Sequence, residues 1–106
     1  MCERVVTAPV FDEIIHAPNR LQICAMLSAV ESAEFSVLRE TLAVSDSVLS
    51  KHVKVLQTEG YVEVTKTSGK AARSTWIALT AEGRQALAGH LAELHRLSDL
   101  ANVDGG

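Results

Sequence analysis

The chain has 106 residues, enough for one domain around a single hydrophobic core. Apolar residues make up 47% of it, too many for a disordered chain, and aromatic residues only 4%, which favours packed helices over a β-sandwich. No apolar run approaches the length of a membrane span, the N-terminus does not resemble a signal peptide, and the two cysteines have neither CxxC nor zinc spacing. We therefore expect a cytoplasmic protein with no membrane partner.

The net charge of −3 hides an uneven distribution along the chain. Residues 51–75 carry five cations and two acids, whereas the rest of the chain carries five cations and eleven acids. A surface that is merely solvated would not concentrate its basic charge in one segment. The segment is therefore a candidate for binding a polyanion such as DNA.

The first third of the chain predicts an arm and two helices. Residues 1–8 are expected to form a flexible arm. A short amphipathic helix is predicted over residues 9–16 from four apolar residues at helical spacing, Val10, Phe11, Ile14 and Ile15. Pro18 stands near the first position of a second helix, predicted over residues 19–29, and a polar connection follows over residues 31–34.

Two helices joined by a tight turn are predicted over residues 35–59. Ser36 is a candidate N-cap for the first of them and Ser45 for the second, which begins at Asp46 and ends near Glu59. The second helix has an apolar stripe that consists of Leu49, Val53 and Leu56. Its opposite face is polar and mostly cationic, with Ser50, Lys51, Lys54 and Gln57.

A β-hairpin is predicted after Gly60, where the apolar pattern changes to a period of two. Its strands span residues 61–66 and 74–79, so that hairpin and connecting loop together occupy residues 61–79. Two pairs of apolar residues are expected to meet across the strands, Val62 and Val64 with Ile77 and Leu79.

A last helix is predicted over residues 81–101, with Thr80 as its N-cap. Leucines recur along it at a spacing typical of a coiled-coil seam. A small domain that exposed this row would show an apolar patch that monomers rarely tolerate, so we expect a homodimer to which the N-terminal helix contributes. The predicted dimer interface consists of Phe11, Ile14, Ile15, Leu87, Leu91, Leu94 and Leu97.

These elements predict a mainly α protein with a small β-hairpin, a winged helix-turn-helix with N- and C-terminal dimerisation helices, in one domain over residues 1–106. The sequence resembles MarR-like winged-helix transcriptional regulators, specifically their short single-domain branch, and also ArsR-type repressors. The resemblance covers residues 11–94 and rests on HAPNRLQICAML, FSVLRETLAVSDSVLSKHVKVLQTEGYVEV and TWIALTAEGRQAL. It implies a homodimer that binds a pseudo-palindromic operator in double-stranded DNA and usually represses.

The resemblance also implies roles for residues of the second helix of the motif, the recognition helix, and of the loop between the strands, the wing. Its base-reading positions match Ser47, Val48, Ser50 and Lys51, and its wing arginine matches Arg73. Independently, the first turns of a helix in the major groove lie nearest the base edges, whereas Lys54, one turn further on, is expected to contact a phosphate. Val48 either contacts a thymine methyl or packs inward. The predicted DNA-binding residues are Ser45, Ser47, Val48, Ser50, Lys51, Lys54, Lys66, Lys70 and Arg73.

Other functions find less support in the sequence. No motif of enzyme chemistry occurs, and no cofactor is expected. No metal site is expected either, because His90 and Glu93 supply only half of one. His52 is expected to be a half-buried histidine that contacts backbone, and Trp76 a packing residue. The alternative function is a winged helix that docks a protein partner and never binds DNA, against which the basic recognition helix counts. A variant of the main function is a sensor for a small-molecule effector of unknown identity, with a pocket between the N-terminal helix and the dimer seam.

Overall fold

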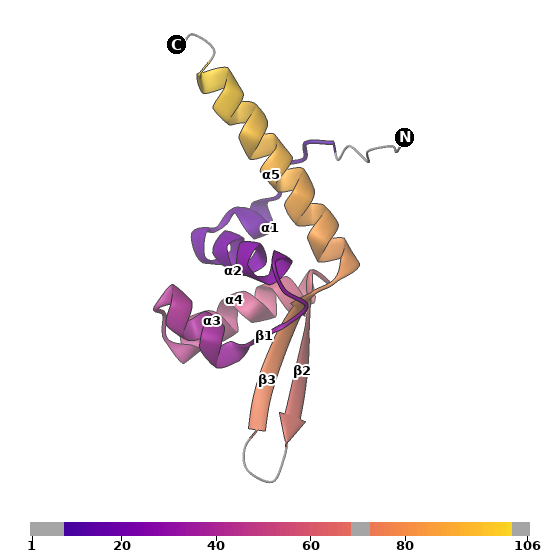
Figure 1. Cartoon of the computed structure of the whole chain (residues 1–106). Coiled ribbons are helices and arrows are strands. Elements are labelled where there is room, and N and C mark those ends of the chain that lie inside the picture. Colours follow the sequence, from indigo (N-terminus) through magenta and orange to yellow (C-terminus); the bar gives the residue numbers. More distant parts are fainter. Residues whose placement is uncertain (1–7, 69–72, 103–106) are drawn as a thin grey trace.

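The computed structural model describes residues 8–68 and 73–102, without the side chains of Ser68 and Arg73. Within these residues the elements are α1 (Glu13–His16), α2 (Pro18–Ser28), β1 (Ala33–Glu34), α3 (Phe35–Leu42), α4 (Asp46–Thr58), β2 (Val62–Ser68), β3 (Arg73–Leu79) and α5 (Ala81–Ala101). The long helix α5 and the β2–β3 hairpin point in opposite directions, and α1 to α4 lie beside them (Figure 1). None of the helices in the described residues combines the length and the apolar character needed to cross a membrane. The predicted fold class, a mainly α winged helix-turn-helix, is confirmed.

The sheet has three antiparallel strands in the order β1-β3-β2. The predicted pairing across the hairpin is confirmed, because Val62 lies opposite Leu79 and Val64 opposite Ile77. The strand β1 corrects the prediction of a polar connection over residues 31–34. It has only two residues, paired with Ile77 and Trp76 of β3, so it is too short to show a period of two in the sequence.

The hydrophobic core lies where α1 to α4 meet the sheet and the first half of α5. The apolar stripe of α4 is buried in it as predicted. The core also contains Ile15 and Leu87, of which 0% and 4% of the surface is exposed. These two residues correct the predicted dimer interface, because a side chain that is already buried within its own chain has no surface left for a partner to cover.

Two of the predicted helix caps are confirmed and two helix starts differ from prediction. The Oγ atom of Ser45 accepts a hydrogen bond from the Val48 N–H, and Oγ1 of Thr80 accepts one from the Gly83 N–H, so these residues cap α4 and α5. Ser36 is not a cap, because α3 begins at Phe35, directly after the strand residue Glu34. The N-terminal helix begins at Glu13 rather than at Pro9. Its cap is Asp12, whose carboxylate accepts a hydrogen bond from the Ile15 N–H.

The end of α4 is joined to the start of α5 by close backbone contacts. The Tyr61 carbonyl accepts a hydrogen bond from the Thr80 N–H at 3.0 Å, and the Thr80 hydroxyl donates one to the Gly60 carbonyl at 2.7 Å. A Cβ atom at Gly83 would lie 2.1 Å from the Tyr61 oxygen, so only glycine fits there. The Leu-Thr-x-Glu-Gly pattern is therefore what this junction requires: a capping hydroxyl and, three residues later, a position without a side chain.

A polar cluster attaches the N-terminal segment and α1 to the rest of the molecule. The second carboxylate oxygen of Asp12 accepts a hydrogen bond from the Tyr61 hydroxyl at 2.6 Å, which together with burial raises the pKa of Tyr61 to about 12. The backbone N–H of Asp12 donates to Nδ1 of His90 on α5, and the N–H of Val10 donates to the Gly89 carbonyl. These contacts bring α1 against α5, although the two are separated by most of the sequence.

Candidate nucleic-acid interface

The outer face of α4 carries the predicted base-reading residues. Ser47, Ser50, Lys51 and Lys54 are all exposed, because they lie away from the buried apolar stripe of the same helix. The side chain of Val48 is also on the surface, with 38% of the residue exposed. The alternative in which Val48 packs inward is therefore excluded.

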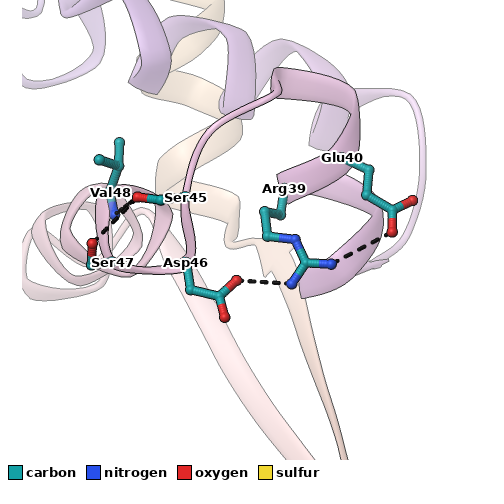
Figure 2. A network of polar contacts seen from close by, with 6 residues as sticks. All are labelled: Arg39, Glu40, Ser45, Asp46, Ser47 and Val48. Carbon is teal, nitrogen blue, oxygen red and sulfur yellow. Dashed lines mark hydrogen bonds and ion pairs between the residues drawn. The ribbon is translucent and has the colours of Figure 1, made fainter.

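The hydroxyl of Ser45 caps the N-terminus of α4. Its Oγ accepts the Val48 N–H at 3.2 Å and lies 3.3 Å from the Ser47 hydroxyl, as Figure 2 shows. The two serines and the first turn of α4 thus form one hydrogen-bonded group at the exposed end of the helix. A DNA contact by Ser45 would have to share the oxygen that caps the helix.

An ion pair spans the turn between the two helices of the motif. Nη1 of Arg39, on α3, lies 2.8 Å from a carboxylate oxygen of Asp46, the first residue of α4, and Nη2 lies 3.5 Å from Glu40 (Figure 2). The Arg39 and Asp46 side chains are 34% and 71% exposed, so the pair adds little to stability. It does neutralise the Asp46 carboxylate, which would otherwise repel phosphates at this end of α4. Arg39 was not among the predicted site residues, because helical periodicity does not extend across a turn.

The turn itself needs one unusual backbone conformation. Ala43 has φ 57° and ψ 46°, the left-handed region in which its N–H bonds back to the carbonyls of Arg39 and Glu40. This closes α3 and redirects the chain into α4. Alanine is a costly choice there, since a Cβ atom in this region is disfavoured by about 1–2 kcal/mol.

A groove of about 660 Å³ runs between α4 and the strands β2 and β3. It brings together Lys54 from α4 and Lys66 from β2, two of the predicted cationic contacts, which are distant in the sequence. The groove is lined by Phe35, Asp46, Ser50, Val53, Lys54, Gln57, Val64, Lys66 and Thr75. Only Ser50, Lys54 and Lys66 of this lining were predicted as site residues. The other six were not, because only the packing of α4 against the sheet brings them together. The predicted wing contact Lys70 lies outside the described residues, as does the side chain of Arg73.

His52, on α4, and Trp76, on β3, are the two ring side chains for which structural roles were predicted. His52 is half-buried as predicted, but it contacts side chains rather than backbone: its ring lies 3.2 Å from the Arg20 guanidinium and 3.5 Å from the Asn19 amide. Trp76 is 37% exposed and lies between Glu34 and Thr65 in the strand register. It packs on the outer side of the sheet, opposite the core residue Ile77.

The residues considered for a metal site are otherwise engaged. Both ring nitrogens of His90 have hydrogen-bond partners, and the Glu93 carboxylate is paired with Arg96 at 2.7 Å. In the part of the chain that the structure describes, no cluster of three or more histidine, cysteine, aspartate or glutamate residues has a geometry that would hold a metal ion.

The surface predicted to form a dimer is partly exposed. Among its predicted members, Phe11 and Leu91 are both 44% exposed and Leu97 41%, whereas Ile14 and Leu94 are half-buried. Two further apolar residues of the N-terminal segment and α5, which were not predicted, are also exposed, namely Val10 at 59% and Leu100 at 57%. We call these seven residues the α5 patch.

A second hollow, of about 390 Å³, lies between the N-terminal segment and α5, near the position expected for an effector pocket. Its lining differs from the expectation, because it includes Val10 and Asp12 but not Phe11, Ile14 or Ile15. The hollow is lined by Ala8, Val10, Asp12, Tyr61, Glu82, Gln85, Ala86 and Gly89.

Comparison with known proteins identifies the family of this chain. Residues 19–98 match a family described as winged helix DNA-binding domain. An uncharacterized protein of Methanocaldococcus jannaschii is 35% identical over 86 residues, which are 81% of this chain and 94% of that protein. The structure of a transcriptional regulator homologue from Pyrococcus horikoshii OT3 is similar with a TM-score of 0.81 and 26% identity, over 86% of this chain and 90% of the other.

A regulator from Enterococcus faecalis V583 that is described as a member of the MarR family has a TM-score of 0.70 at 18% identity, over 86% of this chain and 81% of the other. The MarR-like resemblance is thereby confirmed at the level of the fold. The family match covers most of the chain, and the family is one of DNA-binding domains. The chain belongs to the winged helix DNA-binding domain family and has the fold of MarR-like transcriptional regulators.

Proposed function

We propose that the protein is a homodimeric transcriptional regulator that binds a pseudo-palindromic operator in double-stranded DNA and represses transcription from it. The observation that carries this proposal is the exposed face of α4. Two serines and two lysines lie on it, beside Lys66 of strand β2. Short hydroxyls and lysines are side chains that bond base edges and phosphates in the major groove. Lys51 is the proposed base contact, and Lys54 and Lys66 the proposed phosphate contacts. In this function the protein acts in the cytoplasm, where chromosomal DNA is accessible to it.

The α5 patch supports the homodimer. Its residues lie on the N-terminal segment, on α1 and along α5, the helix that extends away from the rest of the molecule (Figure 1). A second copy that packed its own α5 patch against this one would bury both at once, as an interface with two-fold symmetry does. Two recognition helices related by that symmetry would enter successive major grooves, so that half-site centres lie about ten base pairs apart.

An effector is a further part of the proposal. The hollow between the N-terminal segment and α5, about 390 Å³, is in the size range of small-molecule sites. A ligand there would contact both the N-terminal segment and α5, and would therefore act on the proposed dimer rather than on α4 directly.

The experiment that tests the proposal is selection of sequences from random duplex DNA by the purified protein. We expect a two-fold symmetric site with half-sites about ten base pairs apart. Repression is then tested with a reporter gene that carries the selected site downstream of a promoter. A folded protein that selects no sequence and binds no duplex even at low salt would instead be a winged helix that docks a protein partner.

A further inference from the structure

The recognition helix contacts α2 through polar side chains that meet at the half-buried ring of His52. Nη1 of Arg20, on α2, lies 3.2 Å from Nδ1 of His52, on α4. The same guanidinium donates through Nε to the carbonyl of Ile14, in the last turn of α1. Arg20 therefore connects α1, α2 and α4 at one point, and all three polar side chains involved, including Asn19, are half-buried.

The geometry of this contact determines which nitrogen of His52 carries the proton. A guanidinium can only donate, so Nδ1 of His52 must be the acceptor and must carry no hydrogen. The hydrogen of the neutral ring is then on Nε2, which faces the Asn19 amide at 3.5 Å. Rotation of the Asn19 amide by 180° about χ2 leaves the shape of the side chain unchanged and points Oδ1 toward Nε2. The Nε2–H then has an acceptor.

This arrangement does not accommodate a second proton on the His52 ring. That proton would have to bind Nδ1, the atom that accepts from Arg20, and it would bring two cations to within hydrogen-bond distance of one another. The charged groups that act on the ring are Arg20 of α2 and Lys51 of α4, both positive. Burial first, and then these two cations, lower the pKa of His52 below its usual value.

We propose that Arg20 and His52 are a positioning pair, which holds α4 against α1 and α2 in its DNA-binding orientation only while His52 is neutral. His52 directly precedes Val53 of the buried stripe and follows Lys51 of the exposed face, so a shift of α4 at His52 moves the proposed base contact. Acidification breaks the pair and weakens DNA binding. The inference rests on the proposed function, because its readout is DNA affinity.

The sign of the pH dependence distinguishes this inference from ordinary electrostatics. A histidine that gains a positive charge on a DNA-binding helix normally tightens binding, because the charge attracts phosphates. The positioning pair predicts the opposite result, a loss of affinity between pH 7.5 and pH 5.5. We expect the loss to grow as the pH falls and to approach about fivefold or more, as for an ordinary coupling between two sites, when His52 is fully protonated.

The experiment measures affinity for the selected duplex at both pH values and constant salt, for the wild-type protein and two variants. His52→Asn keeps an acceptor at the place of Nδ1 and does not titrate, and asparagine and histidine have similar helix propensities. We expect this variant to bind as the wild type does at pH 7.5 and to keep that affinity at pH 5.5. Arg20→Ala should bind weakly at both pH values, and in the wild type the ¹⁵N shifts of His52 should show a hydrogen on Nε2 and none on Nδ1.

Circular dichroism at each pH verifies that the proteins compared are folded. The His52→Asn variant also serves as the control for the other histidines, since it retains all of them. If it lost affinity at pH 5.5 as the wild type does, another histidine would be responsible and the inference would be wrong. Wild-type binding that is unchanged or tighter at pH 5.5 would overturn the inference alone. Absence of duplex binding at pH 7.5 would overturn the proposed function and the inference together.

Discussion

His90 and His16 share a hydrogen bond between Nε2 of the first and Nδ1 of the second, at 3.1 Å, across the junction of α5 and α1. Nδ1 of His90 accepts the Asp12 N–H at 2.9 Å, so the neutral ring of His90 carries its hydrogen on Nε2 and donates it to His16. Both nitrogens of a ring with no exposed surface are therefore used. The ring of Phe11 packs on both imidazoles, with centroid distances of 4.8 Å.

Stability should fall on acidification because of this arrangement. Burial and the charge of His16 lower the pKa of His90 below its usual 6.5, against smaller opposing effects of Asp12 and Glu93. The unfolded chain therefore takes up a proton more readily than the folded protein. The contribution of His90 to the free energy of unfolding is complete above pH 6.5 and is lost as the pH falls below it. Urea unfolding at pH 7.5 and pH 5.5 measures the loss.

His90→Asn is the matched variant for that measurement. It keeps an acceptor for the Asp12 N–H, which would otherwise remain unpaired at a cost of about 1–3 kcal/mol, and it does not titrate. The variant should lose less stability than the wild type between the two pH values. An equal loss in both proteins would assign the acid sensitivity to other groups.

Replacement of Gly83 by alanine should destabilise the protein by about 3 kcal/mol or more, because a Cβ atom cannot be placed 2.1 Å from the Tyr61 carbonyl oxygen without moving the backbone. Gly89→Ala is the control on the same helix. There the nearest atom to an added Cβ is the Ala8 carbonyl oxygen at 3.4 Å, an ordinary contact, and we expect a change below about 1 kcal/mol. Thermal unfolding of the two variants compares them. Similar melting temperatures would mean that the backbone at Tyr61 can move away from an added Cβ atom without a large loss of stability.

Lys51 and Lys54 should differ in what their removal does to DNA binding. Lys51→Ala should cost about 1–3 kcal/mol on the selected site and relax the preference at one base position in each half-site. Lys54→Ala should weaken binding to all duplexes to a similar extent and reduce its salt dependence, because a phosphate contact carries no sequence information. Competition assays with selected and scrambled duplexes separate the two effects. If Lys51→Ala weakened every duplex equally, Lys51 would have to be a phosphate contact as well.

Leu91→Glu should convert the proposed homodimer into a monomer. The residue is 44% exposed in the α5 patch, so the charge is tolerated in the single chain but would be buried and unpaired in the dimer. Ala81→Glu introduces the same charge at another exposed position of α5, in its first turn and away from Leu91, and should leave the dimer intact. Light scattering gives the mass of each variant. A mass that Leu91→Glu does not change would place the interface elsewhere.

Much of the fold followed from the sequence alone, because its signals are local. The stripe of Leu49, Val53 and Leu56 needs only the period of one helix, and the Ser45 and Thr80 caps need only the N–H groups three residues further on. The hairpin register followed from alternation within two neighbouring strands. The exposed cationic face of α4 followed in turn, since it is the side opposite the stripe.

Only the tertiary structure decided the contacts between elements that are distant in the chain. Leu87 belongs to the same leucine row as Leu91, yet the first is buried in the core and the second is exposed. The adjacent His90 is fully buried, so at this level the other elements cover only one side of α5. Likewise, no spacing in the sequence relates His52 to Arg20 or His90 to His16. A periodic pattern determines which face of a helix is apolar, whereas the packing of the whole chain determines which residues of that face, and which polar partners, are buried together.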